Sequence, residues 1–187
     1  MSGAASPAPK LRLFVALDLP GPARAALTRY RDAAADPAVW RPLSDESFHV
    51  TLAFLGHRPE GDVERVVAVL RELPPWTAPE LALGDGLLLP PRRARVLTVA
   101  LADPEGALAA LQAAVSASLA AAGVYEPEVR PFRPHVTVAR LRAGARSPRA
   151  LAAEPQAMSF TAGPVTLYRS RLGRSGAVYE PLFARSA

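Results

Sequence analysis

Hydrophobic residues recur along the chain with two periods, and these periods predict its secondary structure. Short runs of apolar and β-branched residues predict strands, whereas apolar residues three and four positions apart predict helices. The expected strands are 11–17, 47–55, 80–89, 94–101, 134–141, 158–170 and 177–183. The expected helices are 22–35, 60–73 and 103–122. Prolines and glycines lie at most of the boundaries between these segments, which supports the division.

The two halves of this pattern are similar to each other. A strand-helix-strand-helix-strand order is followed by strand-helix-strand-strand-strand, and each half has one strand with the tripeptide His-Val-Thr, at His49 and at His135. We therefore expect two related α+β lobes that face each other, each contributing one of these strands to a shared cleft. Residues 1–10 are expected to be a disordered lead-in, and 11–187 a single bilobal domain.

Side chains alternate along a strand, so each His-Val-Thr strand should have two different faces. In the first strand the apolar face consists of Val50, Leu52 and Phe54. The opposite face consists of His49, Thr51, Ala53 and Leu55. In the second strand, the apolar face consists of Val136 and Val138, and the polar face of His135 and Thr137. The apolar faces account for packing into a core, which leaves each histidine and threonine without a packing role.

The two motif histidines could be structural, as buried side chains, or functional, as a catalytic pair. The repetition of His-x-Thr distinguishes these interpretations. A single histidine of this kind is most often a buried side chain whose nitrogens bond to a neighbouring hydroxyl or carbonyl group. Here two of the three histidines stand two positions before a threonine. The third, His57, lacks this context and is expected on the surface, in a loop after Gly56. We therefore favour paired chemistry.

Several classes of site do not fit the sequence. The chain has no cysteine, which excludes disulfides, thiolate metal sites and a cysteine nucleophile. Two histidines without further ligands are too few for catalytic zinc, which normally has three protein ligands. Neither a serine nucleophile elbow nor a Walker phosphate loop is present. Paired acid–base chemistry at phosphorus remains, in which one imidazole accepts a proton, the other donates one, and threonine hydroxyls bond phosphate oxygens.

Charge adds a candidate partner. The chain has 22 basic and 17 acidic residues and a net charge of +5, and a basic surface attracts polyanions such as RNA. All basic residues except Lys10 are arginine, so a bias in composition explains the charge equally well. No apolar run approaches the roughly 20 residues that a membrane helix needs, and 11–19 is a poor signal peptide. We expect a cytoplasmic protein with no membrane partner.

The motifs HVTL at 49–52 and HVTV at 135–138 resemble those of the two-histidine (2H) phosphoesterase superfamily. Within it, the chain resembles the RNA 2′,3′-cyclic phosphodiesterases, also called 2′-5′ RNA ligases, and the similarity extends to 12–20, 95–101 and 167–182. The resemblance implies a bilobal α+β fold, in which two pseudo-two-fold-related antiparallel-sheet lobes carry helices outside and enclose a central cleft. It also implies a hydrolase in RNA processing that opens 2′,3′-cyclic phosphodiester ends to 2′-phosphomonoesters without metal or cofactor.

The resemblance further assigns roles to individual residues. His49 would be the general acid that protonates the leaving 3′ oxygen, and His135 the general base that activates water. Thr51 and Thr137 would hold the phosphate, and Arg140 would contact the substrate. Strict alternation, in contrast, places Arg140 on the strand face opposite His135.

The expected partner is RNA with 2′,3′-cyclic phosphate ends, including tRNA halves that the enzyme would join in a reversible 2′-5′ ligation, and the protein is expected to be a monomer. Two alternatives stay open: a phosphodiesterase for small cyclic phosphates, such as ADP-ribose cyclic phosphate or cyclic nucleotides, and a non-catalytic module that binds RNA ends. Phe14 and Phe54 could stack on a base, but core packing is the expected use of both. Thr98 stands where relatives often carry a bulkier aromatic residue.

Overall fold

The computed structural model describes residues 9–173 and 176–187. The strands are β1 (Lys10–Asp18), β2 (Trp40–Pro42), β3 (His49–Pro59), β4 (Glu80–Leu89), β5 (Val96–Ala102), β6 (His135–Leu141), β7 (Ser159–Thr161), β8 (Val165–Gly173) and β9 (Gly176–Arg185). The helices are α1 (Gly21–Ala34), α2 (Asp62–Arg71) and α3 (Ala107–Ala121). The expected lead-in at 1–10 falls mainly outside the described residues, although Lys10 already belongs to β1.

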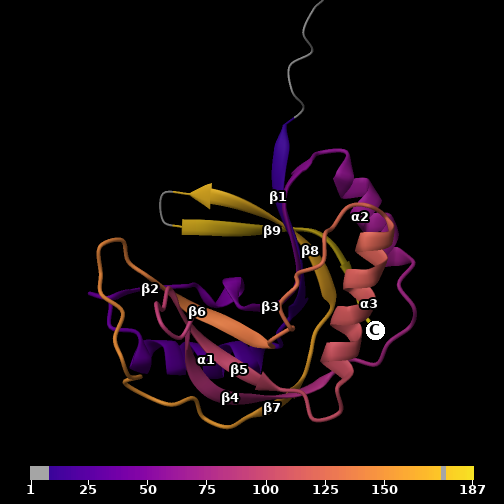
Figure 1. Cartoon of the computed structure of the whole chain (residues 1–187). Helices are drawn as coiled ribbons and strands as arrows, with labels where there is room; N and C mark the ends of the chain where they lie inside the picture. The colour runs from indigo at the N-terminus through magenta and orange to yellow at the C-terminus, as the bar shows by residue number, and fades with distance from the viewer. Residues whose placement is uncertain (1–8, 174–175) are drawn as a thin grey trace, which may run out of the picture.

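The strands form one curled antiparallel sheet (Figure 1). Its order is β7-β4-β5-β6-β3-β1-β8-β9, and β2 pairs with the C-terminal part of β6. Helix α1 packs against β6, whereas α2 and α3 pack against each other and against β3. Helix α1 thus supports the half of the sheet that contains β6, and α2 and α3 support the half that contains β3.

The two halves of the sheet meet at a narrow junction. Within the described residues, β3 and β6 pair only through Val50 and Val136. One half contains β1, β3, β8 and β9, and the other contains β2 and β4 to β7. The predicted α+β fold with two antiparallel lobes is therefore confirmed, and the lobes are joined edge to edge into a single sheet. The lobes do not correspond to the two halves of the sequence, because β4 lies with β5 and β6, whereas β8 and β9 lie with β1 and β3.

Apolar side chains from both halves form one continuous core. Helix α3 buries Leu108, Leu111, Val115 and Leu119, which recur at helical spacing. The helix begins four residues after Asp103, with Gly106 as its N-cap residue. The Asp103 carboxylate still accepts hydrogen bonds from the backbone N–H groups of Leu108 at 3.2 Å and Ala109 at 2.9 Å, so it satisfies two of the free amides at the start of this helix.

Three elements differ from the sequence-based expectation. β2 has only three residues and was missed, because so short a segment carries no periodic signal. β3 continues through Gly56, whose φ of +72° a glycine adopts readily, so His57 lies on a strand and not in a loop, although it is exposed as expected. The expected strand 158–170 is divided into β7 and β8. None of the helices within the described residues has the length and apolar character required to span a membrane.

Candidate active site

The junction between β3 and β6 brings the two His-Val-Thr motifs together. The strands pair at the central valine of each motif. The same antiparallel register sets Thr51 opposite His135 and His49 opposite Thr137. Because both valine side chains are buried in the core, alternation turns the flanking histidines and threonines toward the other side of the sheet. Each histidine therefore lies across from the threonine of the other motif, in the two-fold arrangement that the sequence predicted.

Both histidines are oriented by the same type of hydrogen bond. His49 Nδ1 lies 2.8 Å from the backbone carbonyl oxygen of Ser47, and His135 Nδ1 lies 2.7 Å from that of Arg133. A carbonyl oxygen only accepts, so Nδ1 carries the proton in each ring. Nε2 is consequently the nitrogen of each imidazole that is available to accept or donate a proton.

His49 is enclosed by aromatic rings from three other strands. Its ring centroid lies 4.8 Å from that of Phe14 and 5.3 Å from that of Tyr179, which meets it edge-on. The ring of Tyr168 lies 5.2 Å from that of Phe14 and 6.2 Å from that of His49, and it is stacked with both. These contacts remove most of the imidazole from water, whereas His135 has no such enclosure among the described aromatic pairs.

The enclosure changes the acidity of His49. Burial, which disfavours the charged imidazolium, lowers its pKa from 6.5 to about 4. The hydrogen bond to Ser47 opposes this shift, whereas electrostatic repulsion from Arg140 and from His135 lowers the pKa further. In the free protein at neutral pH, His49 is therefore uncharged, and its protonated form is a stronger acid than an ordinary imidazolium.

A half-buried carboxylate holds the aromatic cluster in place. Asp18, which pairs with His49 in the β1–β3 register, accepts hydrogen bonds from Thr166 Oγ1 at 2.8 Å and from the Tyr168 hydroxyl at 2.9 Å. Burial raises the pKa of Asp18, and these two hydrogen bonds oppose the rise. Tyr168 in turn stacks on Phe14, so the carboxylate fixes the wall against which His49 packs.

An irregularity in β6 turns Arg140 into the cleft. Thr137 pairs with Thr98 and Ala139 with Leu97, so Val138 is an extra residue in the β5–β6 ladder. Val138 and Ala139 are both buried, and the alternation shifts by one position after them. The expectation from strict alternation was wrong: Arg140 lies on the same side as the histidine of its strand and lines a cavity with His49.

A second irregularity corrects the assignment of faces in β3. Ala16 pairs with Thr51 and Val15 with Ala53, so Leu52 is an extra residue. Leu52 and Ala53 are both buried, as is Leu55, whereas Phe54 is 42% exposed. Phe54 therefore lies in the cleft and not in the core, contrary to the expectation from alternation. Phe14 is buried as expected, although its ring also contacts His49.

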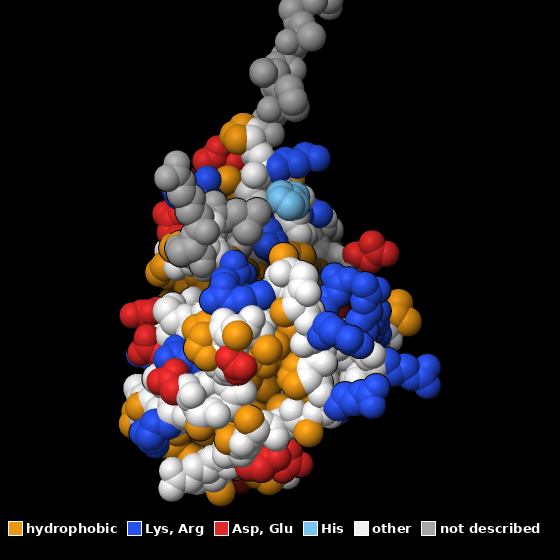
Figure 2. Space-filling model, turned by 90° about the vertical axis from the view of Figure 1, so that its left-hand side faces the viewer, with side chains coloured by type: hydrophobic (Ala, Val, Ile, Leu, Met, Phe, Trp, Pro, Cys, Tyr) orange, Lys and Arg blue, Asp and Glu red, His pale blue; other side chains and the backbone are white. Residues whose placement is uncertain are grey.

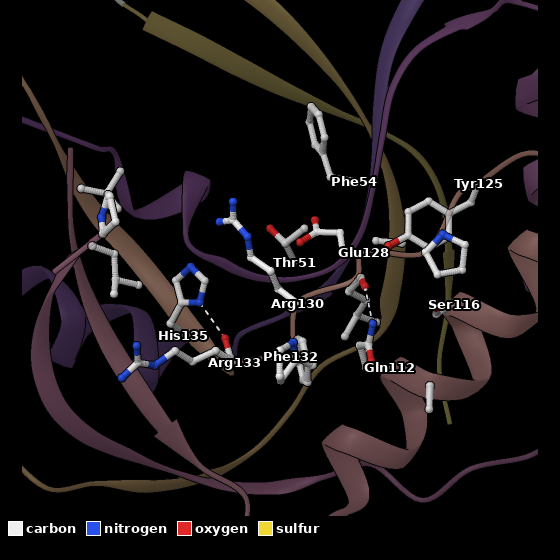
Figure 3. A pocket seen from close by; sticks show the side chains of 18 of the residues that line it. Thr51, Phe54, Gln112, Ser116, Tyr125, Glu128, Arg130, Phe132, Arg133 and His135 are labelled. Carbon is white, nitrogen blue, oxygen red and sulfur yellow. Dashed lines mark hydrogen bonds between the residues drawn. The ribbon is translucent and has the colours of Figure 1, made fainter. Parts of the chain in front are cut away.

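Two cavities extend from the motifs in different directions. The larger, here called the His135 cavity, has a volume of about 830 Å³ and reaches from His135 past Thr51 to Tyr125 and to Ser116 on α3 (Figure 3). The smaller, here called the His49 cavity, has a volume of about 370 Å³ and lies between His49, Arg140 and the β8–β9 hairpin. Thr51 and Phe54 line both cavities.

Of the residues expected in the site, the cleft brings together the two histidines, Thr51 and Arg140. Thr137 lines neither cavity, and its partner in the β5–β6 register, Thr98, is fully buried and donates a hydrogen bond to the Leu87 carbonyl oxygen at 3.2 Å. Sequence reasoning missed Arg12, Arg41 and Tyr179, which also line the His49 cavity. Arg12 and Tyr179 lie in segments that resemble the family, but nothing in those segments marked these residues as part of the site, and Arg41 lies in no such segment.

Arginines dominate the charge of both cavities. Arg95, Arg130 and Arg133 line the His135 cavity. Arg12, Arg41 and Arg140 line the His49 cavity. Among the described residues that line the two cavities, Glu128 is the sole carboxylate. Figure 2 shows Lys and Arg side chains on both sides of a strip of hydrophobic and uncharged surface. The cleft therefore favours an anionic ligand. Within the part of the chain that the structure describes, no three His, Cys, Asp or Glu side chains are grouped closely enough to hold a metal ion.

Several known proteins resemble this chain in sequence and in fold. The RNA 2′,3′-cyclic phosphodiesterase of Escherichia coli (strain K12) is 30% identical over 174 residues, which cover 91% of this chain and 93% of that protein. The RNA 2′,3′-cyclic phosphodiesterase of Thermus thermophilus is 34% identical over 180 residues, or 92% of this chain and 88% of that protein. The crystal structure of E. coli LigT complexed with 3′-AMP superposes with a TM-score of 0.79 at 28% identity, covering 95% of this chain and 98% of that one.

The sequence profile of the 2′-5′ RNA ligase superfamily matches residues 19–174. With a pair of His-x-Thr motifs at the centre of a curled antiparallel sheet, the chain belongs to this superfamily. The family predicted from the two motifs is thus confirmed.

Proposed function

We propose that the protein hydrolyses 2′,3′-cyclic phosphodiester ends of RNA to 2′-phosphomonoesters by acid–base catalysis. The main support is the pair of histidines at the β3–β6 junction, each with Nδ1 bonded to a carbonyl oxygen and, among the described residues, no hydrogen bond at Nε2. The relatives named RNA 2′,3′-cyclic phosphodiesterase supply the class of substrate. The arginine-lined cavities suit its negative charge.

In the proposed reaction, His135 Nε2 removes a proton from water as the water oxygen attacks phosphorus. The bond from phosphorus to the 3′ oxygen breaks, and His49 Nε2 delivers a proton to that oxygen. The product has a 2′-phosphate and a free 3′-hydroxyl group. Attack and departure occur on opposite sides of phosphorus, which suits a phosphate held at Thr51, between a cavity containing His135 and one containing His49.

The low pKa of His49 is compatible with its role as the acid. A bound phosphodiester carries a negative charge that offsets the nearby charge of Arg140, so substrate binding raises the pKa of His49 and favours its protonation. Once protonated, a buried imidazolium releases its proton readily to the leaving oxygen. Thr51 and Arg140, which line the cavities, donate hydrogen bonds to the non-bridging oxygens and stabilise the charge that develops on them. Thr137 is assigned the same role from its place opposite His49, although it lines neither cavity.

The direct test is hydrolysis of an oligoribonucleotide with a 2′,3′-cyclic phosphate, in the presence of excess chelator. The expected product is the 2′-phosphomonoester, which a phosphatase converts to a 3′-terminal diol and mass spectrometry distinguishes from the cyclic substrate. Folded protein that leaves the cyclic end intact would show that the proposed function is wrong. Formation of the 3′-phosphomonoester would show that the assignment of the leaving oxygen is wrong.

A second candidate activity is 2′-5′ ligation, and the size of the His135 cavity supports it. The nucleophile enters on the side of His135, where about 830 Å³ is far more than one water molecule occupies, roughly 30 Å³ in the liquid. A 5′-hydroxyl group of a second RNA end, such as the other half of a cleaved tRNA, could occupy this position. Its oxygen would attack phosphorus, His135 would take its proton, and His49 would protonate the departing 3′ oxygen.

The ratio of ligation to hydrolysis tests this activity. Adding an oligonucleotide with a free 5′-hydroxyl group should divert part of the cyclic substrate into a 2′-5′-linked product. Tyr125→Ala, at the far end of the His135 cavity, should lower ligation more than hydrolysis. Equal loss of both activities in this variant, or hydrolysis alone at any acceptor concentration, would argue against an acceptor site.

A further inference from the structure

Three arginines converge on the His49 cavity. Arg12 comes from β1, Arg41 from β2 and Arg140 from β6, and all three line its wall together with His49. Arg41 and Arg140 are directly opposite each other in the β2–β6 register. Like charges in this position repel each other. Among residues 9–173 and 176–187, none of the three has an ion pair or a side-chain hydrogen bond. The arrangement therefore lacks a compensating anion.

The guanidinium groups of Arg12 and Arg41 are held on different walls of this cavity. Arg12 lies over the ring of Phe54, 5.0 Å from its centroid. Arg41 extends to the β8–β9 hairpin, where its Nη1 lies 3.3 Å from the position that a Cβ atom would take at Gly176. Gly176 and Gly173 both line the cavity, so no side chain of theirs fills the space between the two arginines.

The proposed reaction determines which part of the substrate enters this cavity. The leaving 3′ oxygen must lie beside His49, so the nucleoside that carries it lies on the His49 side of the phosphate. One arginine, Arg140, is near enough to His49 for its charge to affect the pKa of that ring, which places it beside the reacting phosphate. Arg12 and Arg41 remain for a second anionic group on the same nucleoside.

We propose that Arg12 and Arg41 bind the 5′-phosphate of the nucleotide that carries the cyclic phosphate. This inference rests on the proposed function, because the leaving oxygen beside His49 orients the nucleotide. Within an RNA chain the terminal nucleotide always has such a phosphate, since it links that nucleotide to its neighbour. A nucleoside 2′,3′-cyclic phosphate without a 5′-phosphate lacks it. The subsite therefore makes the enzyme prefer RNA ends over nucleoside 2′,3′-cyclic phosphates that lack a 5′-phosphate.

The test compares adenosine 2′,3′-cyclic phosphate with the same compound bearing a 5′-phosphate. For the wild-type protein, kcat/KM should be about 10- to 100-fold higher for the 5′-phosphorylated substrate, the range expected for hydrogen bonds between charged groups. In Arg41→Gln and Arg12→Gln, the ratio of the two kcat/KM values should fall several-fold. Arg29→Gln is the charge-matched control, because Arg29 is exposed on α1, away from the cleft.

A binding measurement separates failure of this subsite from failure of the proposed function. Adenosine 2′,5′-bisphosphate should bind more tightly than adenosine 2′-phosphate in calorimetric titrations, and Arg41→Gln should remove most of this difference while Arg29→Gln retains it. Equal binding of the two ligands to the wild-type protein, or a difference that persists in both cavity variants, would overturn the subsite. Because these ligands are not hydrolysed, that result is independent of catalysis. Circular dichroism and thermal unfolding establish that each variant is folded.

Discussion

Val50 and Val136 form the bridge at which the two halves of the sheet meet, and each is the central residue of a His-Val-Thr motif. Their burial anchors the junction in the core, and their pairing sets each histidine opposite the threonine of the other motif. The same two side chains thus stabilise the fold and determine the geometry of the candidate site. The predictions that follow test the parts of this arrangement that bear on catalysis.

Replacing either motif histidine by asparagine should lower kcat/KM by about 10²- to 10⁴-fold, the usual contribution of a general acid or base. The asparagine amide can still donate a hydrogen bond to the carbonyl of Ser47 or Arg133, but it provides no Nε2 to transfer a proton. His57→Asn is the matched control, since His57 is exposed on the same strand as His49 and should change the rate little. Steady-state kinetics on a cyclic-phosphate oligonucleotide provide the measurement. Comparable losses in all three variants would contradict the assignment.

Arg140→Gln should raise the pKa of His49 above its value of about 4, because the arginine charge disfavours the imidazolium. The shift can be followed by NMR titration of the His49 ring protons. Arg29→Gln, which removes the same charge from an exposed position on α1, should leave this pKa unchanged. An unaltered titration of His49 in Arg140→Gln would mean that the guanidinium does not act on the ring.

His49 should also make the stability of the protein depend on pH. Its pKa is about 4 in the folded protein, against an ordinary value of 6.5. As the pH falls from 6.5 to about 4, the unfolded chain binds a proton that the native state does not. The native state should lose up to about 1.4 kcal/mol per pH unit over this interval and nothing above it.

Urea unfolding of the wild type and His49→Asn at several pH values measures this effect. The free energy of unfolding of the wild type should decline relative to that of the variant between pH 6.5 and 4.5. A difference between the two proteins that stays constant across this range would show that the pKa of His49 is not lowered.

Phe54→Ala should impair activity more than stability. Phe54 is 42% exposed in the cleft, whereas Phe48 is 3% exposed in the core. Truncating the core ring should cost about 3–5 kcal/mol, and truncating Phe54 should cost clearly less. Thermal unfolding together with kcat/KM distinguishes the two variants. If Phe54→Ala lost as much stability as Phe48→Ala, the ring of Phe54 would lie in the core, as simple alternation predicts, and not in the cleft.

Most of the regular structure could be predicted because its signals are local. The helical spacing of Leu108, Leu111 and Val115 indicates α3, and the repeated His-Val-Thr tripeptide indicates both a strand and a site. Hydrophobic periodicity depends on residues only a few positions apart, so it can be detected from the sequence alone. The three-residue strand β2 is too short for such a signal, and with it the position of Arg41 was missed.

The sequence by itself thus determined the class of fold, the paired histidines and the buried valines between them. Tertiary structure alone decided which side chains join them in the cleft. The extra residues Leu52 and Val138 arise from pairing with neighbouring strands, and each shifts alternation by one position, so Phe54 and Arg140 enter the cleft. The low pKa of His49 likewise depends on rings distant along the chain. Register and burial are properties of contacts between distant segments, and a local pattern does not contain them.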